Sequence, residues 1–462
     1  MDLAPDVRCL APGVLFGGTP PRVVRLGRRG AELLGALERG PVNGTASARL
    51  VRRLTDVGIA IPRPCGADVA HAATHDVTVV VPVRDRPAEL AGCLESLGSR
   101  HRVVVVDDGS LDPAAVAAIC RERGADLVRR EVPGGPAAAR NAGLRAVSSE
   151  LVAFVDSDCL PGPCWIEGLS AHFVDPLVAG AAPRIVLPAG WRGSSLMDLG
   201  RSAAPVHPAS RVPYVPAAAV VLRRAALGAG YDERLRYGED VDLVWRLVEA
   251  GWRIRYVPDV EVAHRDPVEI LQRLKRRFFY GTSVGPLARA HPGTLDHLVV
   301  GVGPACAVCC LLLGAPGLAA LAWAATAAHL ARRLRPFGTK SRFALALSSV
   351  QVLHAWVGLG RWCTTFGVPL LGASALGWRT RPARRARRAL AVLVGSALLA
   401  RLVGERGGDR RVVVDDCLGG LAYGCGVVAG CARAGVVGPL LPRIARQTFS
   451  GVAGMSRWRT PR

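Results

Sequence analysis

Pairs of acidic residues follow short apolar runs at two points in the chain. Asp107 and Asp108 come directly after four valines, and Asp156 and Asp158 follow the run LVAFV. Carboxylates one residue apart suit a hard divalent cation, because Mg²⁺ and Mn²⁺ prefer a few carboxylates together with phosphate oxygens. The sequence therefore predicts a Mg²⁺ or Mn²⁺ site at Asp156 and Asp158. The other pair can accept hydrogen bonds from a base or a ribose, although an Asp-Asp-Gly sequence is also ordinary turn chemistry.

A third group of acidic residues, Glu239, Asp240 and Asp242, opens a predicted helix in the stretch YGEDVDLVWRLVEAG. A carboxylate that points into a site from this position can act as a general base on an acceptor hydroxyl. The alternative is that the helix dipole stabilises these carboxylates in the first turn. Trp245, further along the same helix, is a candidate for substrate binding or for the packing face.

Further candidates stand near other predicted strand ends. Val83 and Asp85 lie at the end of the run VTVVVPVRD, Arg140 begins a helix after Gly-Gly-Pro, and His264 follows the short strand VPDVEVA. A lone histidine is more often structural, but one at a strand end beside an arginine can bind a metal or a diphosphate. Neither GxGxxG nor GxxxxGK[ST] occurs at the glycine pair, so a dinucleotide-binding fold is not supported.

The elements that must position these side chains alternate between strands and helices. Between residues 75 and 270, runs of apolar, β-branched residues are separated by helical stretches such as PAELAGCLESL and PAAVAAICRERG. Near-continuous valine runs are typical of parallel strands covered on both faces. This alternation predicts a wound α/β sheet, and ligands bind such sheets at the carboxyl ends of the strands. We therefore expect the acidic residues to meet in one crevice.

The ordered motifs over residues 77–266 resemble glycosyltransferase family 2, whose members are inverting enzymes with the GT-A fold. The resemblance implies metal-dependent transfer of a sugar from a UDP-sugar to an acceptor hydroxyl. By this resemblance Val83, Asp85 and Asp108 line the nucleotide pocket, and Arg140 helps to hold the nucleotide. Asp156 and Asp158 bind the metal. Asp240 is the base, and His264 lies near the leaving diphosphate.

Two positions depart from the pattern of that family. Arg84 stands where an aromatic residue is common, which puts stacking on the base in question. Gln272-Arg-Leu-Lys275-Arg276 only approximates the Gln-x-x-Arg-Trp motif of the processive synthases in the family.

Residues 1–70 precede this core as a separate small segment. Their apolar spacing predicts a strand, two amphipathic helices and a closing strand, which is typical of a small winged-helix-like module. The segment resembles the peptide-recognition domains of peptide-cofactor maturation systems; the alternative is a packing appendage of the core. The first residues show no basic-then-apolar signal pattern, so we expect a cytosolic front domain with reduced cysteines.

Positive charge is concentrated in the last third of the chain. Of the formal net charge of +22, residues 298–462 hold 22 Lys/Arg against 4 Asp/Glu, whereas residues 1–297 hold 37 against 33. A nucleic-acid binder carries such charge on a water-facing groove rather than among long apolar runs, so the pattern argues against nucleic acid as a partner.

Long apolar blocks make up most of this basic region. They predict a helical membrane-associated region over residues 297–442, with a hairpin turn at Gly314–Gly317, and a basic tail over 443–462. The clusters at 332–342 and 379–388 are predicted to be cytosolic loops that attract anionic lipid heads. The alternative is a buried, all-helical soluble domain. The blocks cover residues 298–330, 343–378, 389–400 and 417–432.

The whole arrangement, with its GT-A-like core at 75–290, is similar to the glycosyltransferase family of mycofactocin biosynthesis. The similarity includes the stretches APGVLFGGTPPRVVRLGRRGAELL and GYDERLRYGEDVDLVWRLVEAGWRIRYVPDVEVAHRDP. It implies transfer of glucose from UDP-glucose to a peptide-derived redox cofactor or its precursor, forming a β-1,4-linked oligosaccharide at the cytoplasmic side of the cell membrane. Two alternatives remain: a family-2 enzyme acting on lipid-linked or cell-wall glycans, and a non-catalytic, membrane-anchored protein that binds nucleotide sugars.

Overall fold

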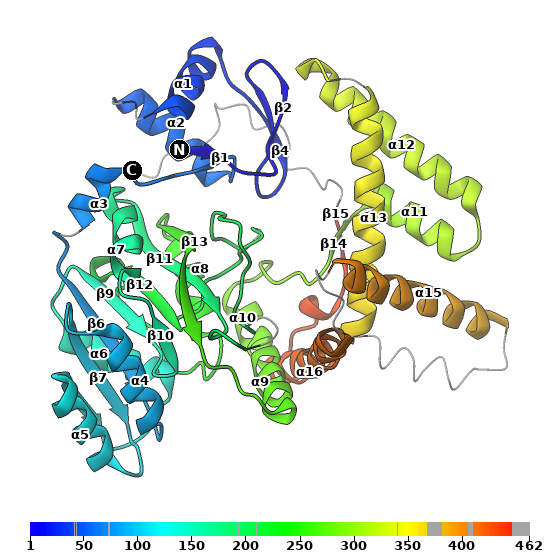
Figure 1. The fold of residues 1–462 in the computed structure, drawn as a ribbon. Helices are drawn as coiled ribbons and strands as arrows, with labels where there is room; N and C mark the ends of the chain where they lie inside the picture. Colours follow the sequence, from blue (N-terminus) through cyan, green and yellow to red (C-terminus); the bar gives the residue numbers. More distant parts are fainter. Residues whose placement is uncertain are drawn as a thin grey trace.

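The computed structural model describes residues 1–40, 42, 44–72, 74–191, 195–208, 210–339, 341–366, 381–404 and 410–445. An eight-stranded sheet flanked by helices forms the core; in the view of Figure 1 a small N-terminal module lies above it and the long C-terminal helices lie to the right. The chain is therefore an α/β protein with a helical C-terminal region, as the sequence predicts.

The core sheet has the strand order β10–β13–β11–β12–β9–β6–β7–β8. The valine-rich strands β6 to β9 pair in parallel, as expected, whereas β12 is antiparallel to both of its neighbours. The sheet is therefore mixed. Its strands are β6 (Val77–Val83), β7 (Arg102–Asp108), β8 (Asp126–Arg130), β9 (Leu151–Val155), β10 (Cys159–Pro161), β11 (Val178–Val186), β12 (Ala219–Arg223) and β13 (Arg253–His264).

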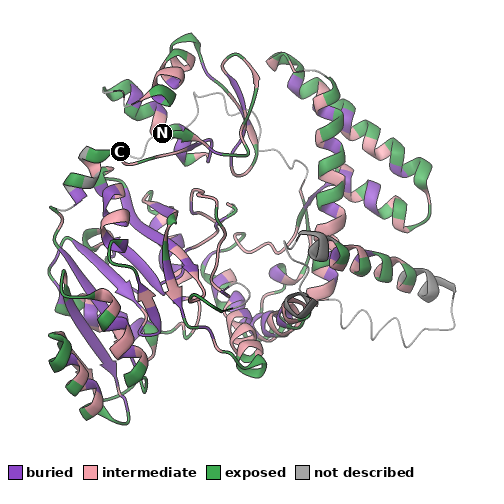
Figure 2. Ribbon diagram, in the orientation of Figure 1, coloured by how far each residue is buried: buried purple, intermediate pink, exposed green. Residues whose placement is uncertain are grey.

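Helices cover both faces of this sheet because successive side chains of a strand point to opposite faces. Val79 and Val81 of β6 pack with helices α4, α5 and α7, whereas Val80 packs with α6 and α8. Both clusters are buried, and the buried sheet stands out in Figure 2. The helices are α4 (Pro87–Leu97), α5 (Pro113–Arg123), α6 (Pro136–Ala146), α7 (Trp165–Ser170) and α8 (Glu239–Glu249), with the short turns η1 (Ala171–Val174) and η2 (Arg224–Ala226).

The N-terminal module contains the predicted strand, the two helices and the closing strand, as β4, α1, α2 and β5. The sequence did not indicate β1 to β3, of which β2 and β3 form a three-stranded sheet with β4. The winged-helix-like class and the peptide-recognition role stay predictions. The elements are β1 (Asp2–Leu3), β2 (Arg8–Ala11), β3 (Val14–Gly17), β4 (Arg22–Arg25), α1 (Arg28–Arg39), α2 (Thr45–Asp56), β5 (Ala60–Ile61) and α3 (Gly66–Ala72).

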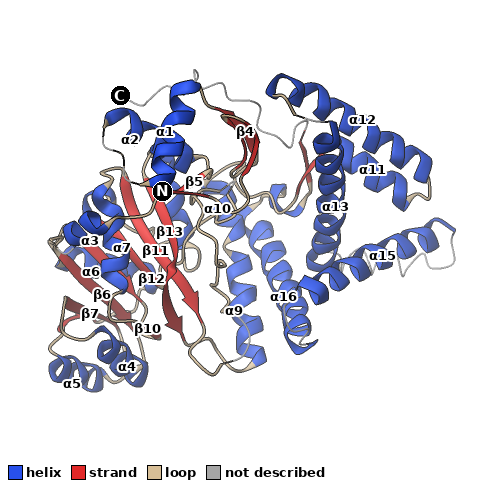
Figure 3. Cartoon of the chain, turned by 45° about the horizontal axis from the view of Figure 1, so that its top comes forward, coloured by secondary structure: helices blue, strands red, loops and turns tan. Residues whose placement is uncertain are grey.

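This module contacts both of the other regions. Asp56 accepts a hydrogen bond from Nε of Arg253 in β13 at 2.6 Å. On its other side, the rings of Phe16 and Phe343 lie 5.2 Å apart, edge to face. The module therefore bridges the sheet and the C-terminal helices (Figure 3).

The C-terminal region is helical, as predicted. Its first apolar block forms a hairpin of α11 and α12 that turns at residues 313–315, close to the expected turn. Its elements, with the two helices that lead into it, are α9 (Ile270–Thr282), α10 (Val284–Ala290), β14 (Val299–Gly301), α11 (Val302–Leu312), α12 (Pro316–Leu334), η3 (Arg335–Phe337), α13 (Ser341–Phe366), α15 (Arg381–Gly404), α16 (Arg410–Ala434), η4 (Gly438–Leu440) and β15 (Arg443–Ala445).

Two of these helices, α13 and residues Val414–Ala434 of α16, are long and apolar enough to cross a bilayer. The basic cluster that starts at Arg381 was expected in a loop, but it forms the first turns of α15. Arginine and alanine are both strong helix formers, so the sequence RPARRARRAL continues a helix. The parts of the predicted apolar block at 367–378 and of the basic tail at 446–462 lie outside the described residues.

Candidate functional site

One cavity of about 1040 Å³ opens at the carboxyl ends of the parallel strands. Residues after β6, β7 and β9, together with α6 and His264, line one part of it, which we call the strand-end half. Residues from α9 and α10, the segment to His297, and α16 line the other part, which we call the helical half. Asp158 and Asp240 both line this cavity, so the predicted crevice shared by the acidic residues is present.

Asp108, the last residue of β7, is held at the cavity wall by the glycine pair that follows β8. Its carboxylate accepts hydrogen bonds from the backbone N–H groups of Gly134 at 2.9 Å and Gly135 at 2.7 Å, and Arg130 Nε lies 3.0 Å away. Gly135 has φ +87°, a backbone conformation that favours glycine. The glycine pair therefore positions a carboxylate at this wall.

Arg140, from α6, joins two of the acidic motifs in the interior of the site. Its guanidinium donates to Asp156 at 2.6 Å and to Glu239 at 2.8 Å, and its side chain is almost fully buried. Burial alone lowers the pKa of Arg140, but the two carboxylates raise it well above its ordinary value. Arg140 is therefore a fixed cation that ties the loop after β9 to the start of α8.

Asp158 lies between two cationic groups. Its two oxygens contact Arg86 Nη1 at 2.5 Å and His264 Nε2 at 3.3 Å. Burial raises the pKa of Asp158, but the hydrogen bond and charge of His264 and the charge of Arg86 lower it to about 2. Asp158 is therefore a carboxylate at neutral pH.

His264 is nearly fully buried, and both of its ring nitrogens face carboxylates. Nδ1 lies 3.0 Å from Asp266, on the side opposite Asp158. Burial lowers the pKa of His264, but the two carboxylates raise it to about 9. Through Nε2 the ring therefore orients the Asp158 carboxylate, and the predicted part of His264 in metal binding stays a prediction.

Asp240 and Glu239 stand at the start of α8, where the two halves of the cavity meet. Asp240 accepts hydrogen bonds from the backbone N–H groups of Val241 at 2.8 Å and Ala217 at 3.3 Å. Burial raises the pKa of Asp240. Burial and the charge of Asp240 raise the pKa of Glu239 to about 7. Carboxylates with raised pKa values at a cavity wall have the properties of acid–base groups.

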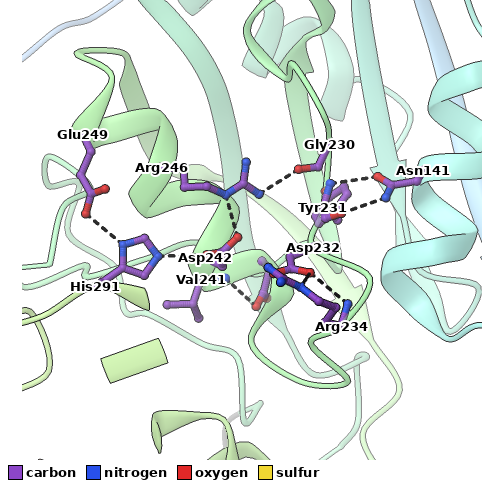
Figure 4. A network of polar contacts seen from close by, with 11 residues as sticks. Asn141, Gly230, Tyr231, Asp232, Arg234, Val241, Asp242, Arg246, Glu249 and His291 are labelled. Atoms are coloured by element: carbon purple, nitrogen blue, oxygen red, sulfur yellow. Dashed lines mark hydrogen bonds and ion pairs between the residues drawn. The ribbon is translucent and has the colours of Figure 1, made fainter. Parts of the chain in front are cut away.

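Asp242, the third acidic residue of this helix, does not line the cavity. It contacts Arg246 Nε at 2.7 Å and His291 Nε2 at 3.0 Å, as Figure 4 shows. Trp245, predicted to bind substrate, lines the cavity, and its indole N–H donates to the carbonyl of Pro213 at 2.8 Å. The indole N–H therefore fixes the backbone at Pro213.

Two predicted substrate-binding residues lie outside the lining of the cavity. Asp107 is fully buried, pairs with Arg129 on β8, and accepts a hydrogen bond from the Ser110 N–H group. Adjacent strand residues point to opposite faces, so Asp107 and Asp108 cannot share one pocket. The carboxylate of Asp85 accepts a hydrogen bond from the Leu111 N–H group at 2.7 Å and so fixes the backbone at Leu111. Val83, by contrast, lines the cavity as predicted.

The predicted metal residues fit a divalent cation by their chemistry. Asp156 and Asp158 both bring carboxylate oxygens to the cavity. Within the described residues, no group of three or more His, Cys, Asp or Glu has metal-binding geometry. Two carboxylates suffice for an ion that takes its other ligands from a diphosphate and water, which is how Mg²⁺ commonly binds.

Sequence reasoning missed Arg86 and most of the helical half. Arg86 comes three residues after the end of β6 and directly before α4, so its place near a strand end was a usable signal. Lys275 and Arg276 line the cavity from α9, in the segment that approximates the Gln-x-x-Arg-Trp motif. The aromatic lining had no such signal: Tyr214, Tyr237, Phe279, Tyr280 and Tyr423 come from segments far apart in the chain.

Comparison with known proteins gives matches over the core and over the full chain. The model of glycosyl transferase family 2 matches residues 78–210. The pre-mycofactocin glycosyltransferase of Mycobacterium tuberculosis is 37% identical over 465 residues, which cover 95% of this chain and 96% of that protein. The succinoglycan biosynthesis protein ExoU of Rhizobium meliloti is 27% identical over 216 residues, 40% of this chain and 60% of that protein.

Among solved structures, a mannosyltransferase from Pyrobaculum calidifontis in complex with GDP-Man and Mn²⁺ is 20% identical, with a TM-score of 0.38. The match covers 72% of this chain and 88% of that chain. The full-length identity to the mycobacterial protein, together with the family match over the core, confirms the family that the motifs predicted. The chain belongs to glycosyl transferase family 2, in the same family as the pre-mycofactocin glycosyltransferase, and it is a glycosyltransferase.

Proposed function

We propose that the protein transfers glucose from UDP-glucose to pre-mycofactocin, with inversion, and extends the product into a β-1,4-linked oligosaccharide. The observation that carries this proposal is the single cavity shared by Asp108, Asp158 and Asp240. It is supported by the full-length similarity to a protein named for that acceptor. The cavity volume of about 1040 Å³ reaches the upper end of the range for one bound ligand, so it has room for a donor and an acceptor.

The strand-end half provides the donor site in this proposal. Asp108 binds the base of the nucleotide, and Asp156 and Asp158 would hold a Mg²⁺ or Mn²⁺ ion. When bound, this ion would supply positive charge next to the departing diphosphate. Arg140 keeps Asp156 in place, and His264 keeps Asp158 in place, through the contacts described above.

Asp240 acts as the base on the acceptor hydroxyl. Its two backbone hydrogen bonds fix the carboxylate, and burial raises its pKa, which makes the carboxylate a stronger proton acceptor. The acceptor oxygen loses its proton to Asp240 as it attacks the anomeric carbon from the face opposite the diphosphate. Holding donor and acceptor side by side at this point supplies much of the rate.

Membrane association is part of the proposal. α13 exposes large apolar side chains, including Leu345, Val350 and Leu353, and it is one of the two helices within the described residues that are both long and apolar enough to span a bilayer. The catalytic domain would then lie at the cytoplasmic face, with the basic residues near α12 and α15 next to anionic lipids.

Mass spectrometry of candidate acceptors tests the function. Purified full-length protein is incubated with pre-mycofactocin, Mn²⁺ or Mg²⁺, and UDP-glucose, with UDP-GlcNAc and GDP-mannose as alternative donors. Successive hexose additions from UDP-glucose are expected. The exposed apolar face of α13 favours a second candidate, transfer to a lipid-linked glycan, so a polyprenyl-diphosphate glycan is included as an acceptor. Transfer to that acceptor alone would contradict the proposal.

A further inference from the structure

The helical half of the cavity depends on α16, a helix from the region that the sequence predicts to be membrane-associated. α16 lies against α9 in both views of the chain (Figures 1 and 3). Its residue Tyr423 lines the cavity, together with His297 and the α10 residues Val284 and Leu287. Tyr423 comes 143 residues after Tyr280 of α9, so a helix from a distant part of the sequence closes one wall of the site.

Glycines bring the two helices into close contact. A Cβ atom on Gly281 of α9 would lie 2.2 Å from the Tyr423 carbonyl oxygen, and one on Gly285 of α10 would lie 2.1 Å from the Gly430 carbonyl oxygen. On α16, a Cβ atom on Gly426 would lie 2.0 Å from the Phe278 carbonyl oxygen. The backbones therefore meet directly, and neither helix can shift without losing this contact.

Two ion pairs fix the register of this contact at the start of α16. Arg273 Nη1 lies 3.0 Å from Asp415, and Arg277 Nη2 lies 3.4 Å from Asp416. The two arginines are one helical turn apart on α9, so their side chains share a face. The position of Tyr423 at the cavity is thus set by contacts on both sides of it along α16.

The Tyr423 side chain is itself oriented by His297. His297 Nδ1 lies 2.9 Å from the carbonyl oxygen of Pro439, and its Nε2 lies 3.4 Å from the Tyr423 hydroxyl. Burial lowers the pKa of His297, so its ring is neutral. A neutral ring that donates Nδ1–H to the carbonyl must accept at Nε2. The Tyr423 hydroxyl therefore donates to His297 and keeps its lone pairs for another partner.

Other aromatic groups continue this wall toward the base. The rings of Tyr237 and Phe279 are stacked, with centroids 5.1 Å apart and planes at 10°. Tyr214 and Tyr280 line the cavity as well, and burial together with the charge of Asp240 raises the pKa of both hydroxyl groups. Aromatic faces with hydroxyl groups at their edges suit a ring that has both apolar faces and polar edges.

We propose that the helical half is the acceptor site, that it binds the hydroxyl-bearing ring of the acceptor, and that Tyr423 contacts this ring. His297 is a positioning residue, which acts through the Tyr423 hydroxyl. The inference rests on the proposed function, because it needs a ring-bearing acceptor that is glycosylated. In this proposal, α16 contributes Tyr423 to the acceptor site.

Steady-state kinetics on the full-length protein tests this assignment. Transfer to pre-mycofactocin is measured at varied acceptor and saturating UDP-glucose, and then at varied donor; hydrolysis of UDP-glucose without acceptor is measured separately. Tyr423→Phe and His297→Asn each remove the hydroxyl contact, and each is expected to raise the acceptor KM about threefold to tenfold. Tyr423→Ala also removes the ring and is expected to raise it tenfold or more. Donor KM and donor hydrolysis should stay within about twofold, since KM for one substrate reports binding of that substrate.

Two control variants match these changes. Tyr256→Phe removes a hydroxyl that donates to the Gly200 carbonyl away from the cavity, and Cys425→Ala changes an exposed residue of α16. Neither should alter the acceptor KM. The double variant Tyr423→Phe with His297→Asn should behave like either single variant, because both remove the same contact.

The possible results separate the two proposals. If the wild-type protein glycosylates pre-mycofactocin and the Tyr423 variants keep its acceptor KM, the proposed function stands and the acceptor assignment is wrong. Equal increases in donor and acceptor KM would also overturn the assignment, because they indicate a general structural role. If the wild-type protein does not glycosylate this acceptor, the proposed function fails, and the inference fails with it.

Discussion

The two halves of the cavity are built in different ways. In the strand-end half, each acidic side chain is held by a nearby cation or by backbone N–H groups, as Asp108 is held by Gly134 and Gly135. In the helical half, the aromatic side chains Phe279, Tyr280 and Tyr423 stand among apolar and charged ones, and glycine contacts between helices set the position of Tyr423. The strand-end half suits the charged nucleotide of the donor. The helical half suits the ring of an acceptor, which can differ from one acceptor to another. The difference suggests that donor chemistry and acceptor choice can be changed separately.

The largest expected effect comes from Asp240, where the halves meet. Asp240→Asn keeps the size of the side chain but removes the base, so kcat is expected to fall about 10³-fold. Binding of UDP-glucose, measured by isothermal titration calorimetry, should remain. Asp242→Asn, two residues along the same helix and outside the cavity lining, is the matched control. If Asp240→Asn transfers sugar at the wild-type rate, Asp240 is not the base.

Removal of divalent metal should lower the rate of transfer through the strand-end half alone, where the predicted metal residues lie. With EDTA, the rate of transfer is expected to fall about 100-fold or more, because several kcal/mol of charge stabilisation on the diphosphate are lost. Mn²⁺ or Mg²⁺ should restore it. Asp158→Asn should raise the metal concentration needed for half-maximal rate, whereas Tyr423→Phe should leave it unchanged. Full activity in EDTA would show that the carboxylates serve only their arginine partners.

The sequence predicted the strand-end half well because its side chains stand next to strand ends. Val83, Asp108 and Asp158 follow apolar runs, and the carboxyl ends of parallel strands meet at one edge. Asp107 was expected at the same pocket, but its side chain points to the other face of the sheet. The sequence alone does not show which of two adjacent strand residues faces the cavity. Arg86 was missed because its partner Asp158 lies 72 residues later in sequence.

The helical half was harder to predict because it depends on contacts between distant segments. Tyr423 is an ordinary residue in an apolar block until α16 is placed on α9. One signal was available: the spacing Gly281-x-x-x-Gly285 matches Gly426-x-x-x-Gly430, and small residues at this spacing let helices approach closely. The hydrophobicity of the block predicted membrane association, with a buried helical domain as the alternative, and neither interpretation indicated that residues Val414–Ala434 pack on α9 at the cavity.

The glycine contact is the most direct way to disturb the helical half alone. In Gly281→Ala, the new Cβ atom meets backbone of α16, so α16 must move, and the free energy of unfolding is expected to fall by about 2 kcal/mol. The acceptor KM should rise, while hydrolysis of UDP-glucose stays near the wild-type rate. Gly420→Ala is the control on α16, where a Cβ atom meets only Thr365 Oγ1 at 4.0 Å. It should gain up to about 1 kcal/mol from helix propensity. Equal losses of hydrolysis and transfer in Gly281→Ala would mean that the halves are not separable.

Glu239, at the start of α8, is expected to make the stability of the protein depend on pH. Burial and Asp240 raise its pKa from 4.5 to about 7 in the folded protein. Between these values the folded state keeps a proton that the unfolded chain releases, so stability falls as pH rises through this window. Glu239→Gln removes the titration and keeps an acceptor for Arg140. Urea unfolding, followed by tryptophan fluorescence, should therefore show Glu239→Gln gaining about 2 kcal/mol relative to wild type between pH 5 and pH 7.5.

The control for this measurement is Glu122→Gln, since Glu122 is an exposed residue of α5. It should follow the wild-type pH profile. Because the Arg140 ion pair opposes the effect of burial, the gain is smaller than full burial of a lone carboxylate would give. If Glu239→Gln and wild type lose stability in parallel between pH 5 and pH 7.5, Glu239 is ionised throughout. The positive charge of Arg140 would then compensate the ionised carboxylates of both Asp156 and Glu239. Asp240 alone would remain as the acid–base group of the site.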